Sequence, residues 1–72
     1  MVKSNFTGKT YDHKKTIRIL NAQQAAAYIK HGIVLLDLWL SKDKEGKPIL
    51  VFIFDKEESK DVYDLWCKHE LN

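Results

Sequence analysis

The sequence holds little that could cross-link the chain or anchor it in a membrane. It has one cysteine, Cys67, so an intrachain disulfide cannot form and an oxidising compartment is not indicated. No apolar run approaches the roughly 20 residues of a membrane-spanning helix, and residues 1–11 lack the apolar stretch of a signal peptide. We therefore expect a cytoplasmic protein that does not enter a membrane.

Motifs for nucleotide, metal or nucleophilic chemistry are also missing. The three glycines lie far apart, and neither of the glycine-rich phosphate-binding patterns occurs. The three histidines show no metal-ligand spacing, and there is no C-x-x-C pair. On a helix Cys67 and His69 would lie about 200° apart, too far round for a nucleophile and its base. The sequence predicts a protein that is not an enzyme, with no catalytic residue, metal site or cofactor.

The chain of 72 residues is close to the smallest that folds around one hydrophobic core. Its apolar content of 44% is enough to fill such a core. Without disulfides or a metal, a domain of this size needs dense packing or association with another chain. Association with a second copy is therefore one expectation.

Periodicity predicts the element order strand, helix, strand, strand, helix. The segment Thr16 to Leu20 alternates between apolar and polar residues, as a half-buried strand does. Asn21 and Gly32 are typical of the start and the end of a helix between them. We expect an α+β protein with a three-stranded sheet and two helices in a single domain, residues 15–72, after a flexible basic N-terminal arm, residues 1–14.

The second half of the domain is predicted as a hairpin followed by an amphipathic helix. Two apolar runs, 33–40 and 48–54, flank a charged loop, and Asp55 is suited to cap a helix from Lys56 to about Glu70. The stripes that we expect to be buried are Ala22, Ala25, Ala26 and Ile29 on the first helix and Ser59, Val62, Leu65, Trp66 and His69 on the second.

The hairpin is apolar on both of its faces. Two short helices can cover one face of a three-stranded sheet, so the other face needs the N-terminal arm, a second copy of the chain or another protein as its cover. One helix on each face is the alternative arrangement. We interpret one face as a protein-binding surface, formed by Leu35, Trp39, Ile49, Val51 and Ile53. Asp37 interrupts this face, and we expect it at a rim or paired with a basic residue across the hairpin.

The positive charge is concentrated near the N-terminus. Residues 1–18 carry five basic side chains against Asp12, a net charge of +4 in a chain whose total is +2. An alternative function follows from this, in which the arm binds the phosphates of a nucleic acid. The residues that would make those contacts are Lys3, Lys9, Lys14, Lys15 and Arg18.

Residues 15 to 71 resemble a group of small uncharacterised proteins encoded by phages and mobile elements of Gram-positive bacteria. The resemblance lies in residues 15–19, in Gln23 to Gly32 and in Phe52 to Glu58. It implies a β-α-β-β-α domain in a bacterial host and lends no catalytic residues. Small phage proteins commonly bind host or phage macromolecules. We therefore expect a non-enzymatic protein-binding module, with inhibition of a host defence system such as a CRISPR effector as one form.

Overall fold

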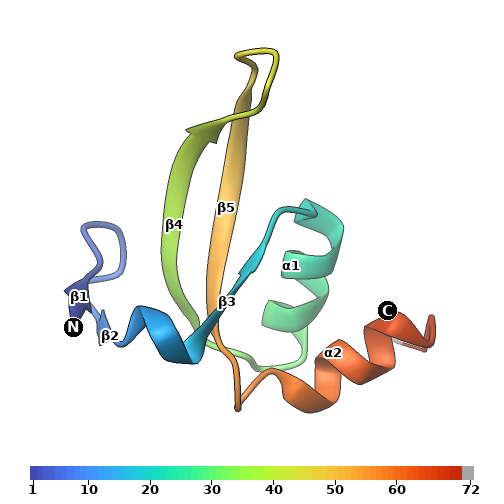
Figure 1. The fold of residues 1–72 in the computed structure, drawn as a ribbon. Helices are drawn as coiled ribbons and strands as arrows, with labels where there is room; N and C mark the ends of the chain where they lie inside the picture. The colour runs from blue at the N-terminus through green and yellow to red at the C-terminus, as the bar shows by residue number, and fades with distance from the viewer. Residues whose placement is uncertain (71–72) are drawn as a thin grey trace.

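The computed structural model describes residues 1–70 and has the predicted element order after its N-terminal segment. The main sheet has the order β3-β5-β4, with β3 (Thr16–Ile19) and β4 (Leu35–Lys42) each antiparallel to the central β5 (Pro48–Asp55). The helices α1 (Ala22–Lys30) and α2 (Lys60–Cys67) complete an α+β domain. Both helices lie on one side of the sheet, and the N-terminal segment lies on the other (Figure 1).

The structure does not show the flexible arm that the composition predicts. Residues 1–14 contain a small antiparallel ladder between β1 (Val2–Lys3) and β2 (Thr10–Tyr11), followed by a 3-10 turn, η1 (His13–Lys15). Tyr11 is buried against Val51 and Ile53 of β5. The arm is thus the cover for the second sheet face, because an aromatic ring buried there removes apolar surface of both partners from water.

The helix α1 starts and ends where the sequence predicts, but a different side of it is buried. The Asn21 side chain accepts hydrogen bonds from the backbone N–H groups that open the helix. Ala25 and Tyr28 are completely buried, whereas Ile29 is 47% exposed. The stripe predicted through Ala22, Ala26 and Ile29 is therefore wrong. The helix turns the large ring of Tyr28 toward Phe54, with 5.3 Å between ring centroids, because that ring buries more apolar area than Ile29 would.

The helix α2 is shorter than predicted. The Asp55 carboxylate accepts a hydrogen bond from Glu58 N at 2.8 Å, as a cap would, but it stabilises a turn, and the helix begins only at Lys60. Val62 is buried and Trp66 is half-buried on the core. His69, predicted on the buried stripe, is exposed with φ of 59° after the helix has ended.

A β-bulge at Leu36 changes the faces of β4. Leu35 is opposite Phe54, and the next pairing joins Asp37 to Ile53, so Leu36 has no partner of its own. Side chains of a strand normally alternate between its two faces. One extra residue breaks this alternation, so the residues before the bulge lie on the opposite face from the one that alternation with the later residues predicts. Leu35 therefore packs on the helix side of the sheet, whereas Leu36 and Trp39 lie on the side of the N-terminal arm.

Candidate functional site

The predicted protein-binding face is mostly used inside the molecule. Val51 and Ile53 are buried beneath Tyr11, and Trp39 packs on the same cluster. Ile49, nearer the tip of the hairpin, is half-buried. Leu35 is on the opposite face because of the bulge, so grouping it with Trp39 was wrong. This face is therefore not the open apolar surface that the sequence suggested.

Asp37 anchors the N-terminal segment to that face. Its carboxylate accepts hydrogen bonds from Ser4 Oγ at 2.6 Å, Tyr11 Oη at 2.6 Å, Trp39 Nε1 at 2.5 Å and Leu38 N at 2.8 Å. Burial alone would raise the pKa of Asp37, but these four donors outweigh it and hold the pKa at about 2. Burial and the neighbouring Asp37 carboxylate raise the pKa of the Tyr11 phenol, because both disfavour its ionised form. The expected basic partner of Asp37 is thus replaced by neutral donors.

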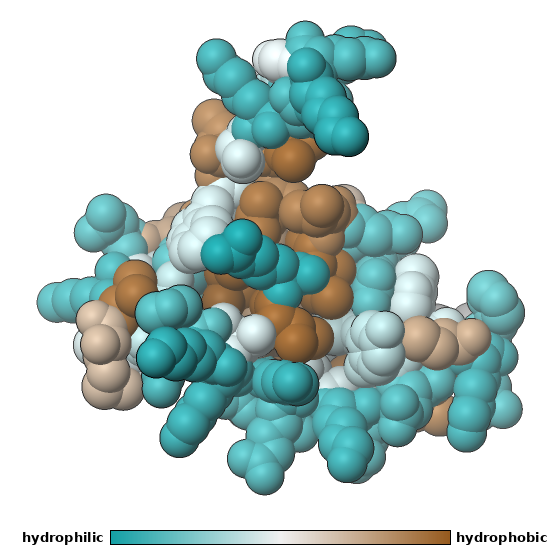
Figure 2. Space-filling view, viewed as in Figure 1, coloured by the Kyte–Doolittle hydropathy of each residue, from teal (hydrophilic) through white to brown (hydrophobic). Residues whose placement is uncertain are grey.

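The outer half of the hairpin leaves large apolar side chains open to solvent. We call residues 39–51 the projecting hairpin: β3 pairs with β5 only as far as Phe52, so the ribbon beyond it has two strands. Leu40 and Leu50 face each other across this ribbon and are 75% and 45% exposed. The hairpin rises beyond both helices in Figure 1, and hydrophobic side chains are visible just below its charged tip in Figure 2.

The five basic residues proposed for nucleic-acid binding lie in three places. Lys3 and Lys9 belong to the N-terminal ladder and its loop. Arg18 lies over the Trp39 ring, with its guanidinium carbon 5.2 Å from the ring centroid. Lys14 and Lys15 line a shallow hollow of about 500 Å³ at the start of β3. Lys3 and Arg18 both lie beside Trp39, and Lys15 lies beside Thr10 and Tyr11. The structure does not test nucleic-acid binding, which stays a prediction.

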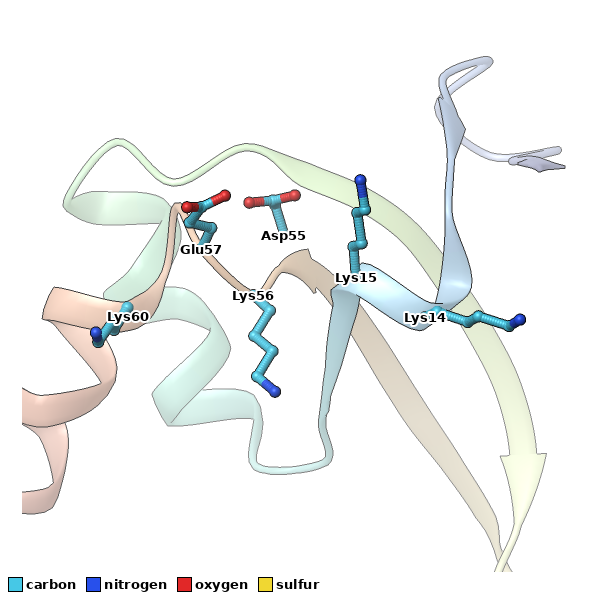
Figure 3. Close-up of a pocket in the computed structure, with 6 residues that line it drawn as sticks. All are labelled: Lys14, Lys15, Asp55, Lys56, Glu57 and Lys60. Carbon is cyan, nitrogen blue, oxygen red and sulfur yellow. The ribbon is translucent and has the colours of Figure 1, made fainter.

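Two lysines that the sequence did not single out share this hollow. Lys56 and Lys60, from the turn after β5 and from α2, line it together with Asp55 and Glu57. In Figure 3 the Lys56 side chain extends away from the two carboxylates, and Lys14 points away from the rest of the group. The signal that could have found them is the pair of lysines four positions apart around the start of α2, to which the sequence analysis gave no role.

The described residues form no cluster of metal ligands, and the single cysteine lies at the surface. In residues 1–70 no three His, Cys, Asp or Glu side chains gather closely enough to hold a metal ion. Cys67 is exposed at the end of α2. Over the same residues, no helix has the length and apolar character needed to cross a membrane.

The fold and these surfaces define a small α+β domain with a projecting two-stranded ribbon that exposes Leu40 and Leu50. Comparisons with known protein families, with curated proteins and with solved structures found no match to the chain.

Proposed function

We propose that this chain is a non-enzymatic protein-binding module and that the projecting hairpin is its main contact surface. The observation that carries the proposal is the exposed cross-strand pair of Leu40 and Leu50. Large apolar side chains that are adjacent and open to water favour association, because burying them in a contact removes their surface from solvent.

A second copy of the chain is the partner that these features favour most. A two-stranded ribbon is only marginally stable in water, and packing against another ribbon supplies the missing apolar contact. A two-fold symmetric dimer brings the same surface of each copy together, so Leu40 and Leu50 would meet their own counterparts. The N-terminal segment leaves this contact free, because it reaches the start of β4, where Thr7 Oγ1 donates to Leu36 O at 2.6 Å.

The test is sedimentation of the full chain beside two lysine variants. We expect the wild type to sediment as a dimer at high micromolar concentration and Leu40→Lys to sediment as a monomer, since an unpaired charge in an apolar contact is costly. Ser41→Lys, one residue further and on the other face of β4, adds the same charge and should remain dimeric.

Circular dichroism separates loss of association from loss of the fold. Leu40 is so exposed that Leu40→Lys should keep the helix and strand signal of the wild type. A wild-type monomer at high micromolar concentration, or equal dissociation of both lysine variants, would contradict the proposed surface. The phage setting and the inhibition of a host defence system stay predictions, because nothing in this fold bears on them.

A further inference from the structure

The outer edge of β3 is open along its whole length. Within residues 1–70 no other strand pairs with β3 on the side away from β5. In an antiparallel pair, hydrogen-bonded and non-hydrogen-bonded residue pairs alternate. Lys56 N donates to Lys15 O at 2.9 Å, so two residues further along β3 the backbone groups of Ile17 also bond to β5, opposite Phe54. The backbone N–H and C=O groups of Thr16 and Arg18 therefore point outward, where an added strand would meet them.

An apolar groove runs beside this edge, between β3 and α2. Its volume is about 520 Å³, and its walls include Ile17 and Ile19 from the strand and Tyr63 from the helix. Tyr63 is 47% exposed, so its ring is available to a ligand. The groove lies on the helix side of the sheet, because Ile19 packs in the same cluster as α1 and α2. Every second side chain of a strand added to β3 would point into it.

The charged groups that line the groove are all positive. Arg18 borders the groove, but its guanidinium lies over Trp39 on the other face of the sheet. The charges on the groove side are those of Lys56 and Lys60, and no carboxylate lines the groove. These cations are not neutralised from within, because the one ion pair among the described residues joins Lys47 to Glu45 at the hairpin tip. Figure 3 shows the Lys56 side chain directed away from Asp55 and Glu57. A ligand for this groove therefore needs negative charge as well as apolar side chains.

We propose that β3 and the groove bind an extended, acidic segment of a partner protein by strand addition. The backbone of that segment bonds to Thr16 and Arg18, its apolar side chains pack on Ile17 and Tyr63, and its carboxylates reach the lysines at the rim. This surface is separate from the projecting hairpin, so either contact can exist without the other.

The first experiment measures binding of labelled, end-blocked peptides to the full chain by fluorescence anisotropy. A short peptide that carries both valine and glutamate at the alternate positions facing the groove, with threonine between them, should bind, and the binding should weaken with added salt. The matching peptide of valine and lysine should not bind. The double variant Lys56→Glu, Lys60→Glu should weaken binding of the acidic peptide at least about tenfold, as reversal of close charges does at interfaces. The control Lys44→Glu, Lys47→Glu changes the charge equally at the hairpin tip and should bind as the wild type does.

A second experiment tests strand addition without changing the protein. N-methylation of alternate residues removes the backbone donors from one edge of the peptide. Of the two possible methylation phases, one should abolish binding and the other should leave it intact, because only one peptide edge faces β3. Binding should also slow hydrogen exchange at the Arg18 amide.

Several results would overturn the proposal. One is that the acidic peptide does not bind at millimolar concentration. Another is that the groove variant and the hairpin-tip variant lose the same amount of peptide affinity. A third is that both methylation phases change the peptide affinity equally. Labelled oligothymidylate that binds tightly and is lost in the Lys56 and Lys60 variant, with no peptide binding, would assign the surface to nucleic acid. Leu40→Lys should retain the peptide, so failure of the hairpin contact and failure of this groove are distinguishable.

Discussion

Tyr28→Ala is expected to unfold most of the chain at 25 °C. Tyr28 is completely buried, and its ring packs at 5.3 Å from that of Phe54. Truncating a buried aromatic side chain costs about 3–5 kcal/mol, which is comparable to the whole stability of a domain this small. Circular dichroism and urea unfolding would measure the loss directly.

Two neighbouring substitutions make this prediction specific to the observed orientation of α1. Tyr28→Phe removes only the hydroxyl that accepts a hydrogen bond from Gln24 Nε2 at 2.9 Å, and we expect a loss of about 1 kcal/mol. Ile29→Ala lies on the exposed side and should cost less than about 1 kcal/mol. If Ile29→Ala were the more damaging substitution, α1 would pack on the stripe that periodicity predicted.

Local signals were sufficient for the element order. Asn21 caps α1 through its own side chain, and Gly32 adopts φ of 89° just after the helix, as a C-terminal glycine does. The alternation of β5 correctly separates Phe52 and Phe54 from Val51 and Ile53. These features depend on residues close together in the sequence, which is why the sequence alone could predict them.

The remaining features depend on contacts between distant residues. Ser4 and Asp37 are separated by 33 positions, and nothing in the composition of the arm indicates that a buried carboxylate will hold it. The bulge at Leu36 inserts one residue without an accompanying glycine or proline, so the faces of β4 were assigned wrongly before it. Trp66 lies on the predicted stripe of α2 but is only half-buried, and α2 begins at Lys60 instead of Lys56 because the segment after Asp55 forms a turn.

The candidate surfaces were hidden from the sequence for the same reason. Exposure of Leu40 and Leu50 depends on how far β3 and the helices extend along the sheet. The groove requires β3 and α2 to meet, which brings Ile17 and Tyr63 into one groove from positions 46 residues apart. A hydrophobic pattern shows that the hairpin has two apolar faces, but three-dimensional packing decides which part stays open.

Removing the Asp37 carboxylate should release the N-terminal segment and weaken the fold. In the folded chain the pKa of Asp37 is about 2, below its usual value of 3.8, so the ionised form is stabilised by folding. This contribution is complete above about pH 5 and is lost as the pH falls toward 2, and the difference in pKa corresponds to about 2 kcal/mol. Asp37→Asn abolishes this acid-sensitive contribution at every pH, because an amide has no charge to be stabilised by the four donors.

Urea unfolding and limited trypsin digestion together test whether the Asp37 carboxylate holds the N-terminal segment in place. At pH 7 we expect Asp37→Asn to be about 2 kcal/mol less stable than the wild type, with the two converging near pH 2. The control Asp64→Asn changes an exposed carboxylate and should have the same free energy of unfolding as the wild type at pH 7 and at pH 2. Trypsin should cut after Lys9 much faster in Asp37→Asn, since Ser4 and Tyr11 lose their shared acceptor while the helix side of the sheet keeps its own core. A constant gap between wild type and variant from pH 7 to pH 2, with unchanged cleavage at Lys9, would show that the arm is held by Tyr11 packing alone.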